Sequence, residues 1–513
     1  MPIFVGVKSN MMKIWKLLAI AMLPMSVANG YAEDLVILHT NDVHGNVRPM
    51  RSKEAGGMLR MQVAIDSIRE SEDNVLLVDA GDDVQGFMHY SLFGGRVEYE
   101  LMNRMGYEIA AIGNHEFDDG LDSLKRNYDI LKAQVVCANY DFSETPLAGR
   151  IKPFVVKTYG DKKIAVIGVG CDPDNLVVAE NYEGMKYRWP VALADSIAGS
   201  LKSKGEADYA IVLSHLGYQS IPSLPCDSVM ALTTHNIDLI IGGHSHTEIN
   251  PAKGDHHYVF INLDGEKVLV TQTGVNGVNL GKITIDLDDL DEVPDYELLP
   301  IDNRYDNRLD KATEEWLAPF DREVERVMAV EVARSADDMP DDSDELCNWV
   351  ADVIYAIGSK VHGEPVDLAV TNKGGIRQPL RKGMVSMGEI MTMVPFPNSV
   401  LIVELDGKTL QSCLNEIVAT GGQAVSRQLS FGAKDGKAVN ITINGNPLDP
   451  DKLYKVATID YVYNGGDRLV SFKKGKIVSR SNRFMKYDFV DYLKTLDSPI
   501  QADRTKRMYI IEN

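Results

Sequence analysis

Short apolar runs recur between residues 35 and 288, and they constrain the fold of this chain more than any other feature. The runs are rich in Val, Ile and Leu and are too short for helices, which is typical of strands buried on both faces. Helical stretches such as Gly57–Ser71 and Leu121–Lys132 lie between them, so the sequence predicts an α/β domain built of layers. The runs are Leu35–Leu38, Val75–Val78, Ile109–Ile112, Ile164–Val169, Ala210–Leu213, Ile237–Ile241 and Val268–Val270.

Residues that bind metals follow these runs. Open α/β sheets place their sites in the loops just after the strands, so these residues are expected to meet. Five of the 11 histidines of the chain lie in the segments concerned. The segments are Asp42-Val43-His44, Gly81-Asp82, Gly113-Asn114-His115-Glu116, Ser214-His215 and Gly243-His244-Ser245-His246, with Gln272 at a further strand end.

The donor types in these segments indicate the chemistry. Carboxylate, imidazole and amide oxygen form a mixed set that suits Zn, Mn, Co, Ni or Fe better than Ca alone. Two such ions a few ångströms apart activate a water and clamp a phosphate. The single residue between Asp42 and His44, and between His244 and His246, predicts extended segments whose two side chains point the same way. A lone His-x-His is a weak signal, and five segments together are a strong one.

In that order, the five segments resemble the signature of the calcineurin-like metallophosphatases. The resemblance implies a four-layer αββα domain that holds two divalent metal ions (Zn, Mn, Co or similar). It implies that Asp82 bridges both ions. The remaining ligands it implies are Asp42, His44 and His246 for the first ion, and Asn114, His215 and His244 for the second.

The same resemblance gives His115 and Asp118 catalytic roles without metal ligation. His115 is expected to contact the phosphate, and Asp118 to orient its imidazole. A histidine paired with a carboxylate holds its proton more readily and can donate to an oxyanion. His39 and Gln272 remain open between a supporting role behind the ligands and an ordinary structural one. The other histidines are expected to be structural or solvent-facing.

At 513 residues the chain is too long for one core, and a second domain is predicted. Residues 306–332 have helical spacing and are followed by the acidic loop 335–343, so helix and loop are expected to connect the domains. An apolar helix, Leu346–Ile357, then opens the C-terminal part. Its strand-like runs are Leu368–Val370, Val400–Leu405, Val439–Ile443 and Tyr454–Ala457.

Three motifs in this part resemble the substrate-binding domain of 5′-nucleotidases. With the N-terminal half, the match to the secreted 5′-nucleotidase and UDP-sugar hydrolase family covers nearly the whole mature chain, and implies an α+β second domain. The motifs are Asn372-Lys373-Gly374-Gly375-Ile376-Arg377, Val394-Pro395-Phe396-Pro397-Asn398 and Tyr461-Val462-Tyr463-Asn464-Gly465-Gly466-Asp467.

The resemblance implies that Asn372 and Arg377 approach the phosphate or ribose, that Asp467 accepts from ribose hydroxyls, and that Tyr461 stacks on the base. A surface ion pair, a turn and core packing are the plain alternatives for Arg377, Asp467 and Tyr461.

This chain departs from the family in several places. No second stacking aromatic lies in residues 422–429, and an arginine expected near Pro340 is missing, so Arg381 or Arg427 would have to replace it. Lys373 and Pro397 stand where the family has glycine.

The N-terminus predicts export. Lys13 and Lys16 precede a short apolar run from Leu17 to Leu23, and small residues follow. This pattern is typical of a signal peptide, and the run is too short for a membrane anchor.

The expected divisions are a signal peptide at 1–32, a metallophosphatase domain at 33–300, a helical linker at 301–343 and a substrate-binding domain at 344–513. Five widely spaced cysteines form no disulfide framework, although one disulfide is possible.

The predicted function is that of an exported, periplasmic or secreted, dimetal 5′-nucleotidase that acts on a small nucleotide. The net charge of −21 disfavours a nucleic-acid polymer as partner, and neither membrane insertion nor a partner protein is indicated. A 2′,3′-cyclic-nucleotide phosphodiesterase with 3′-nucleotidase activity and a UDP-sugar pyrophosphohydrolase are the alternative enzymes. A nucleotide-binding surface protein with a decayed site is the alternative that is not an enzyme, and the intact ligand set disfavours it.

Overall fold

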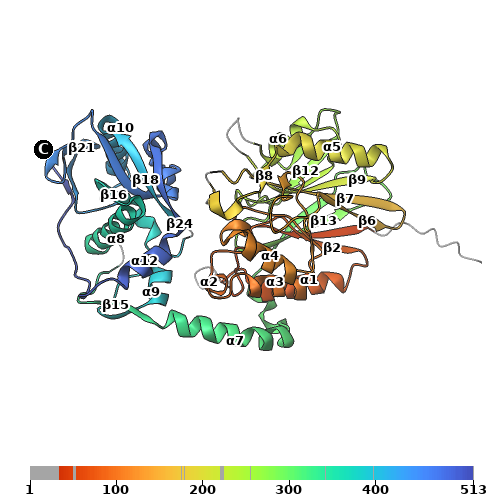
Figure 1. Ribbon diagram of the computed structural model, residues 1–513, viewed down its shortest axis with the longest axis horizontal. Coiled ribbons are helices and arrows are strands. Elements are labelled where there is room, and N and C mark those ends of the chain that lie inside the picture. Colours follow the sequence, from red (N-terminus) through yellow and green to blue (C-terminus); the bar gives the residue numbers. More distant parts are fainter. Residues whose placement is uncertain are drawn as a thin grey trace, which may run out of the picture.

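The computed structural model describes residues 34–49, 54–174, 176–177, 179–219, 225–254, 256–340, 343–396 and 398–511. The predicted signal peptide at 1–32 and Pro397 lie outside these residues. Two α/β bodies lie side by side, and one long helix runs along one end of the pair (Figure 1). No helix within the described ranges has the length and apolar character to cross a membrane.

The first sheet of the N-terminal body has six strands in the order β14-β13-β1-β2-β3-β4. Strands β1 to β4 run parallel, so their carboxyl ends lie at one edge, while β13 is antiparallel to both of its neighbours, β1 and β14. The strands are β1 (Leu35–Thr40), β2 (Val75–Asp79), β3 (Ile109–Ala110), β4 (Gln134–Val135), β13 (Asn279–Ile285) and β14 (Asp295–Pro300).

The second sheet has the order β11-β12-β10-β9-β7-β6, and its inner strands β7, β9, β10 and β12 are parallel. The strands are β6 (Phe154–Tyr159), β7 (Lys162–Gly170), β9 (Tyr209–His215), β10 (Leu239–Gly242), β11 (Val259–Ile261) and β12 (Lys267–Thr271). A separate pair is formed by β5 (Tyr140–Asp141) and β8 (Lys186–Tyr187).

Three apolar layers hold this body together. Ile37 and Val78 of the first sheet pack against Ile211 and Leu239 of the second. The outer face of the first sheet is covered by α1, α3 and α4, and that of the second by α5 and α6. The predicted four-layer αββα arrangement is therefore confirmed. The helices are α1 (Met58–Arg69), α2 (Met88–Phe93), α3 (Arg96–Met105), α4 (Gly120–Ile130), α5 (Pro190–Ser203) and α6 (Asp227–Thr233), with short 3₁₀ turns η1 (His115–Phe117) and η2 (Ala179–Tyr182).

The connecting helix is shorter than the spacing predicts. Residues 303–308 form a 3₁₀ turn, η3 (Asn303–Arg308), and the helix proper is α7 (Lys311–Met328). Asp310 causes the break, because its backbone is extended and its carboxylate accepts from the backbone N–H of Thr313 as an N-cap. After α7 the chain forms β15 (Glu331–Ser335), which pairs with β17 (Gly383–Ser386) of the C-terminal part.

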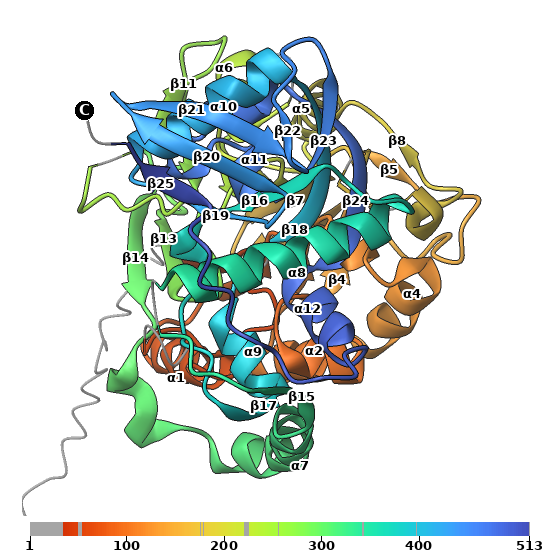
Figure 2. The ribbon, with the colours of Figure 1, turned by 90° about the vertical axis from the view of Figure 1, so that its left-hand side faces the viewer.

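The C-terminal body has a five-stranded sheet, β19-β16-β23-β18-β24, and a four-stranded one, β22-β21-β20-β25. Helix α8 lies across the first sheet, and α10 packs on β21 of the second (Figure 2). The strands are β16 (Leu368–Thr371), β18 (Ser399–Asp406), β19 (Ala424–Val425), β20 (Leu429–Lys434), β21 (Lys437–Ile443), β22 (Asn446–Pro447), β23 (Leu453–Ile459), β24 (Lys476–Phe484) and β25 (Met508–Ile510). The helices are α8 (Asp344–His362), α9 (Met387–Met393), α10 (Gly407–Ala419), α11 (Asp460–Tyr463) and α12 (Met485–Leu493), with turns η4 (Lys373–Gly375), η5 (Gly466–Arg468) and η6 (Val470–Lys474).

The corner between β24 and α12 faces the N-terminal body (Figure 1). The buried ammonium of Lys486 donates to the backbone carbonyl of Gly86, and the hydroxyls of Tyr487 and Ser91 lie 2.5 Å apart. The ring centroid of Phe484 lies 5.8 Å from that of His115. This corner therefore reaches the loops that carry the predicted catalytic residues.

The five cysteines are all buried, and no disulfide joins them in the described structure. The disulfide left open by the sequence is therefore not formed.

A buried arginine ties the C-terminal segment to α8. The guanidinium of Arg507 donates to both carboxylate oxygens of Asp352 at 2.8 Å, and also to Asp503 at 2.6 Å and to the carbonyl of Val425 at 2.8 Å. Arg427 makes a bidentate contact with the same Asp352, but its side chain is 66% exposed.

Arg507→Ala should therefore lower the free energy of unfolding by about 3–5 kcal/mol, because it leaves the buried carbonyl of Val425 without its donor and removes the buried one of the two guanidinium partners of Asp352. Arg427→Ala removes a pair with the same carboxylate at the surface and should cost no more than about 1 kcal/mol. Urea unfolding of the two variants measures the contrast. Equal losses would mean that burial does not set the strength of these contacts.

Candidate dinuclear metal site

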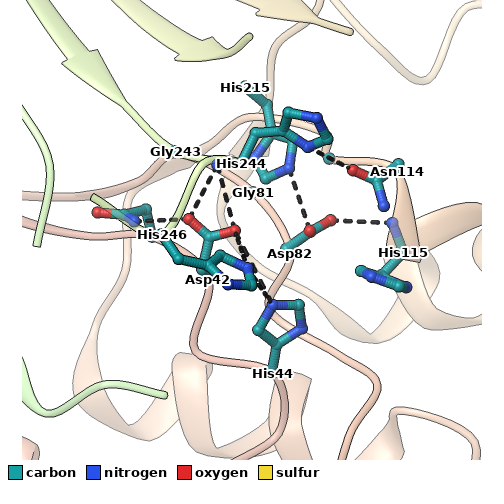
Figure 3. A network of polar contacts seen from close by, with 12 residues as sticks. Asp42, His44, Gly81, Asp82, Asn114, His115, His215, Gly243, His244 and His246 are labelled. Atoms are coloured by element: carbon teal, nitrogen blue, oxygen red, sulfur yellow. Dashed lines mark hydrogen bonds and ion pairs between the residues drawn. The ribbon is translucent and has the colours of Figure 1, made fainter. Parts of the chain in front are cut away.

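The predicted ligands converge at the carboxyl ends of the parallel strands of both sheets. Asp42 follows β1, Asp82 follows β2, His215 ends β9, and His244 follows β10. Figure 3 shows Asp82 between His215 and His115, with Asp42 beside the loop that carries His244 and His246. The structure thus brings the seven predicted ligands into one cluster, and two groups within it could each hold an ion: Asp42, His44 and His246; and Asp82, His215 and His244. A third group of suitable geometry, His44, Asp82 and His115, includes the histidine that is predicted not to be a ligand.

The backbone at these ligands differs from the extended geometry that the sequence predicts. Asp42 and His44 have φ of 50° and 51°, and His244 and His246 have φ of 74° and 56°. Asp82 has φ of 59°. These are left-handed values, which cost non-glycine residues about 1–2 kcal/mol each and cluster at functional sites. The paired side chains therefore meet through left-handed turns, and the strand alternation inferred from the sequence is wrong.

One half of the cluster is built around Asp42. Its carboxylate accepts from the backbone N–H of His244 at 2.9 Å and from the side chain of Asn41 at 2.6 Å. Nε2 of His246 lies 3.4 Å from Asp42 Oδ1 and 3.1 Å from Nε2 of His44. Burial lowers the pKa of His44 to about 4, so this imidazole is neutral, which is the form that binds metals.

The other half is built around Asp82. Its Oδ1 accepts from the backbone N–H of His115 at 2.9 Å, and its Oδ2 lies 3.1 Å from Nε2 of His215. Nδ1 of His244 lies 2.8 Å from Oδ1 of Asn114. Burial also lowers the pKa of His244 to about 4.

The donor set fits divalent cations. Nδ1 of His215 donates to the carbonyl of Ala80 at 2.8 Å, which orients the ring so that the buried Nε2 faces Oδ2 of Asp82 at 3.1 Å. Burial would lower the pKa of His215, but Asp82 outweighs it and raises that pKa to about 10. The site therefore favours positive charge between these side chains, as a bound cation would supply.

Two buried side chains, those of Gln272 and Asp227, are hydrogen-bonded to the segments that carry predicted ligands. Gln272, left open by the sequence, donates to the carbonyl of Gly243 at 2.9 Å and to Asp227 at 3.0 Å, and accepts from the hydroxyl of Ser245 at 3.0 Å. It thus supports the loop that carries His244 and His246. Asp227 also accepts from Ser214 Oγ at 2.5 Å.

Glu116 has the same role for the other loops. Its carboxylate accepts from the backbone N–H groups of Asp82, Asp83 and Gly113 at 3.1, 2.9 and 2.7 Å. Sequence reasoning missed Glu116 and Asp227, because neither stands at a ligand position. His39, the other open residue, stacks on Tyr296 and packs over Gly281 with no hydrogen-bond partner in the described structure. It is a core residue.

His115 and Asp118 form the expected pair. Nδ1 of His115 lies 2.7 Å from Oδ2 of Asp118, and because a carboxylate only accepts, Nδ1 carries the proton. Burial would lower the pKa of His115, but Asp118 and Asp82 outweigh burial and raise it to about 10. The imidazole is therefore a proton donor beside the metal cluster.

The predicted substrate residues all lie in the C-terminal body, away from the predicted metal ligands in the sequence. The hydroxyl of Tyr461 donates to Oδ1 of Asp467 at 3.0 Å, and the ring of Tyr461 is exposed. Asn372 is buried, and its Oδ1 has no partner among the described residues. The guanidinium of Arg377 lies 5.1 Å from the ring centroid of Phe396. Each of these contacts stays within the C-terminal body and reaches none of the metal ligands.

Neither Arg381 nor Arg427, the two candidates to replace the missing family arginine, contacts Tyr461 or Asp467 through an ion pair in the described structure. Arg427 is paired with Asp352, and Arg381 is exposed and forms no ion pair within the part of the chain that the structure describes. Phe431 is fully buried in the core, so it is not a second stacking ring.

Both halves of the chain match known protein families. Residues 35–248 match the calcineurin-like phosphoesterase family, and residues 326–474 match the 5′-nucleotidase C-terminal domain. A 5′-nucleotidase-related protein of Glossina morsitans morsitans is 29% identical over 96% of this chain and 97% of its own length. The trifunctional nucleotide phosphoesterase YfkN of Bacillus subtilis is 25% identical over 93% of this chain, which spans 35% of that protein. The crystal structure of a 5′-nucleotidase precursor from Thermus thermophilus is 26% identical, with a TM-score of 0.65 over 94% of this chain and all of that one.

Asp82→Ala should remove both metal ions together, because one carboxylate is predicted to serve both. Asp118→Asn is the matched control, since it changes a neighbouring carboxylate of the site and should leave the metal content intact. Elemental analysis of the purified variants measures the metal per chain. Two ions retained in Asp82→Ala would contradict the bridging role.

Proposed function

Because the chain belongs to the family that joins a calcineurin-like phosphoesterase domain to a 5′-nucleotidase C-terminal domain, we propose that it hydrolyses nucleoside 5′-monophosphates to nucleoside and phosphate. At the coarser level it is a metal-dependent phosphoester hydrolase. The observation that carries the proposal is the convergence of the seven predicted ligands beside a hydrogen-bonded histidine–aspartate pair, with a tyrosine–aspartate pair on the second body.

The chain's own residues suit phosphate ester hydrolysis. Two divalent ions held by the seven ligands would supply an activated water and offset charge on the phosphoryl oxygens. His115, which donates from Nδ1 to Asp118, has Nε2–H left for a phosphoryl oxygen, where it stabilises the charge that develops. Asp118 keeps the imidazole protonated and oriented. Glu116 and Gln272 hold the ligand loops, so that little reorganisation is needed.

The nucleoside end of the substrate belongs at the second body. The exposed ring of Tyr461 offers a face for the base, and Asp467 beside it offers an acceptor for ribose hydroxyls. Asn372 and Arg377 complete the group near the phosphate or ribose. In the present arrangement Phe484, and not Tyr461, lies against His115. We include in the proposal a change in the relative position of the two bodies that lets one substrate touch both groups.

Location and alternatives belong to the same proposal. The N-terminal leader at 1–32 favours export to the periplasm or beyond. The name of the similar YfkN protein, a trifunctional nucleotide phosphoesterase, favours a second candidate, a phosphodiesterase with 3′-nucleotidase activity on the same scaffold. A UDP-sugar pyrophosphohydrolase is the third.

A substrate panel tests the proposal directly. We expect phosphate release to be fastest from AMP, compared with 3′-AMP, 2′,3′-cyclic AMP and UDP-glucose, and to stop on addition of a chelator, because hydrolysis needs the metal ions. Asp82→Ala serves as the negative control for contaminating phosphatases. Faster turnover of the cyclic nucleotide or of UDP-glucose would replace the 5′-nucleotidase assignment by the corresponding alternative. Activity that survives metal removal would overturn the whole mechanism.

Tyr461→Ala should raise KM for AMP about 5- to 150-fold, because base–aromatic stacking is worth about 1–3 kcal/mol. It should leave hydrolysis of a small phosphomonoester without a base nearly unchanged. Tyr461→Phe is the matched control, since it keeps the ring and removes only the hydroxyl that donates to Asp467. Steady-state kinetics on both substrates measure the contrast. An equal loss on both substrates would show that Tyr461 supports the fold and does not bind the base.

A further inference from the structure

Gln85 lies in the loop after β2 that also carries Asp82, and no role has yet been given to it. Its side-chain Nε2 donates to Oδ2 of Asp118 at 2.8 Å. That oxygen is the one that accepts from Nδ1 of His115 at 2.7 Å. Gln85 therefore holds the partner of the phosphate-facing histidine, from a different loop of the sheet edge.

Two donors on one carboxylate oxygen fix the orientation of the carboxylate. With His115 alone, the carboxylate of Asp118 could rotate about its last torsion, which is soft, and the imidazole would follow. The second donor restrains that rotation. The backbone of Asp118 is held separately: Asn181 donates to its carbonyl at 2.7 Å, and its N–H donates to the carbonyl of His115 at 3.2 Å. Neither contact orients the carboxylate.

The backbone at Gln85 is strained. Its φ is 74°, a left-handed value that glycine adopts without strain and other residues rarely do. The side-chain Oε1 of Gln85 accepts from the N–H of Gly86 at 3.1 Å, and the carbonyl of Gly86 accepts from Lys486 of the C-terminal body. The surrounding contacts therefore hold the backbone of Gln85 in a strained conformation, and such strain is common at functional sites.

Gln85 is not needed to place Asp82. The backbone N–H groups of Asp82 and Asp83 are held by the carboxylate of Glu116, independently of Gln85. Loss of the Gln85 side chain should therefore leave the metal ligands where they are and release only Asp118.

We propose that Gln85 is a positioning residue of the hydrolysis, which holds Asp118 and, through it, the imidazole of His115 in the orientation that donates to the phosphoryl oxygen. This inference rests on the proposed role of His115. Gln85 acts through Asp118 and does not touch the substrate, so it contributes to kcat and not to substrate affinity.

Gln85→Gly is the informative variant, because glycine fits the φ of 74° and removes only the side chain. We expect kcat on a small phosphomonoester to fall about three- to tenfold, the size of one hydrogen bond's net contribution, with KM and metal content unchanged. The melting temperature should be equal to or above that of the parent, since the backbone strain is relieved. Gln85→Glu keeps the shape and the acceptor for Gly86 but loses the donor, and should lose at least as much kcat.

Two controls isolate the effect. Asp435→Gly makes the same kind of backbone change at φ of 49° in the β20–β21 turn, and should not alter kcat. In an Asp118→Ala background, Gln85→Gly should cost nothing further, because its target is gone. His115→Ala is the benchmark for the proposed function and should lower kcat by about two to three orders of magnitude.

The outcomes separate the two proposals. Parental kcat in Gln85→Gly, together with a large loss in His115→Ala, would overturn the role of Gln85 and leave the proposed function standing. Parental kcat in His115→Ala would overturn the proposed function itself. A rise in KM alone, loss of metal, or a full additional loss in the Asp118→Ala background would each assign Gln85 to a different task and contradict the inference.

Discussion

Two buried carboxylates at neighbouring strand ends determine which groups must surround them in the N-terminal body. The strands β1 and β2 are parallel and in register, with Thr40 opposite Asp79, so the loops that carry Asp42 and Asp82 leave the sheet together. Both carboxylates are almost fully buried. Charges taken out of water are costly unless they are paired and hydrogen-bonded. The imidazoles and backbone N–H groups gathered around them, together with the divalent cations that the family match implies, offset this cost.

The position of the ligands at strand ends explains which parts of the site could be predicted from the sequence. Ligand residues that stand directly after apolar runs are recognisable, because strand ends of a parallel sheet share an edge, and the apolar runs themselves were found at β1, β2, β7, β9, β10 and β12. The local geometry was not recognisable. Asp42 and His44 have left-handed backbones that no two-residue spacing reveals, since the turn is imposed by the packing of loops from both sheets.

The supporting residues were beyond the sequence for a related reason. Glu116 stands next to the predicted catalytic residue His115 but accepts from a backbone N–H group 33 positions away, and Gln272 reaches a loop from a separate strand. Such roles depend on which loops meet and not on residue type. The connecting helix was predicted too long because its spacing continues through residues 306–310, whereas the cap at Asp310 restarts it. In the C-terminal body, the motif residues Tyr461 and Asp467 are hydrogen-bonded to each other, as their shared motif suggests. Their position relative to the metal ligands depends on how the two bodies are arranged, which no local sequence pattern reveals.

The contact between the two bodies buries a charged side chain. Lys486 puts an ammonium between the rings of Phe87, Phe484 and Tyr487, and burial lowers its pKa to about 8. An all-apolar seam of the same shape would adhere more strongly, because a desolvated cation with a single carbonyl acceptor in the described structure subtracts from the gain of burying the rings. If the bodies part, as the proposed motion requires, this charge would return to water. Close packing combined with a modest free energy of association suits that proposed motion.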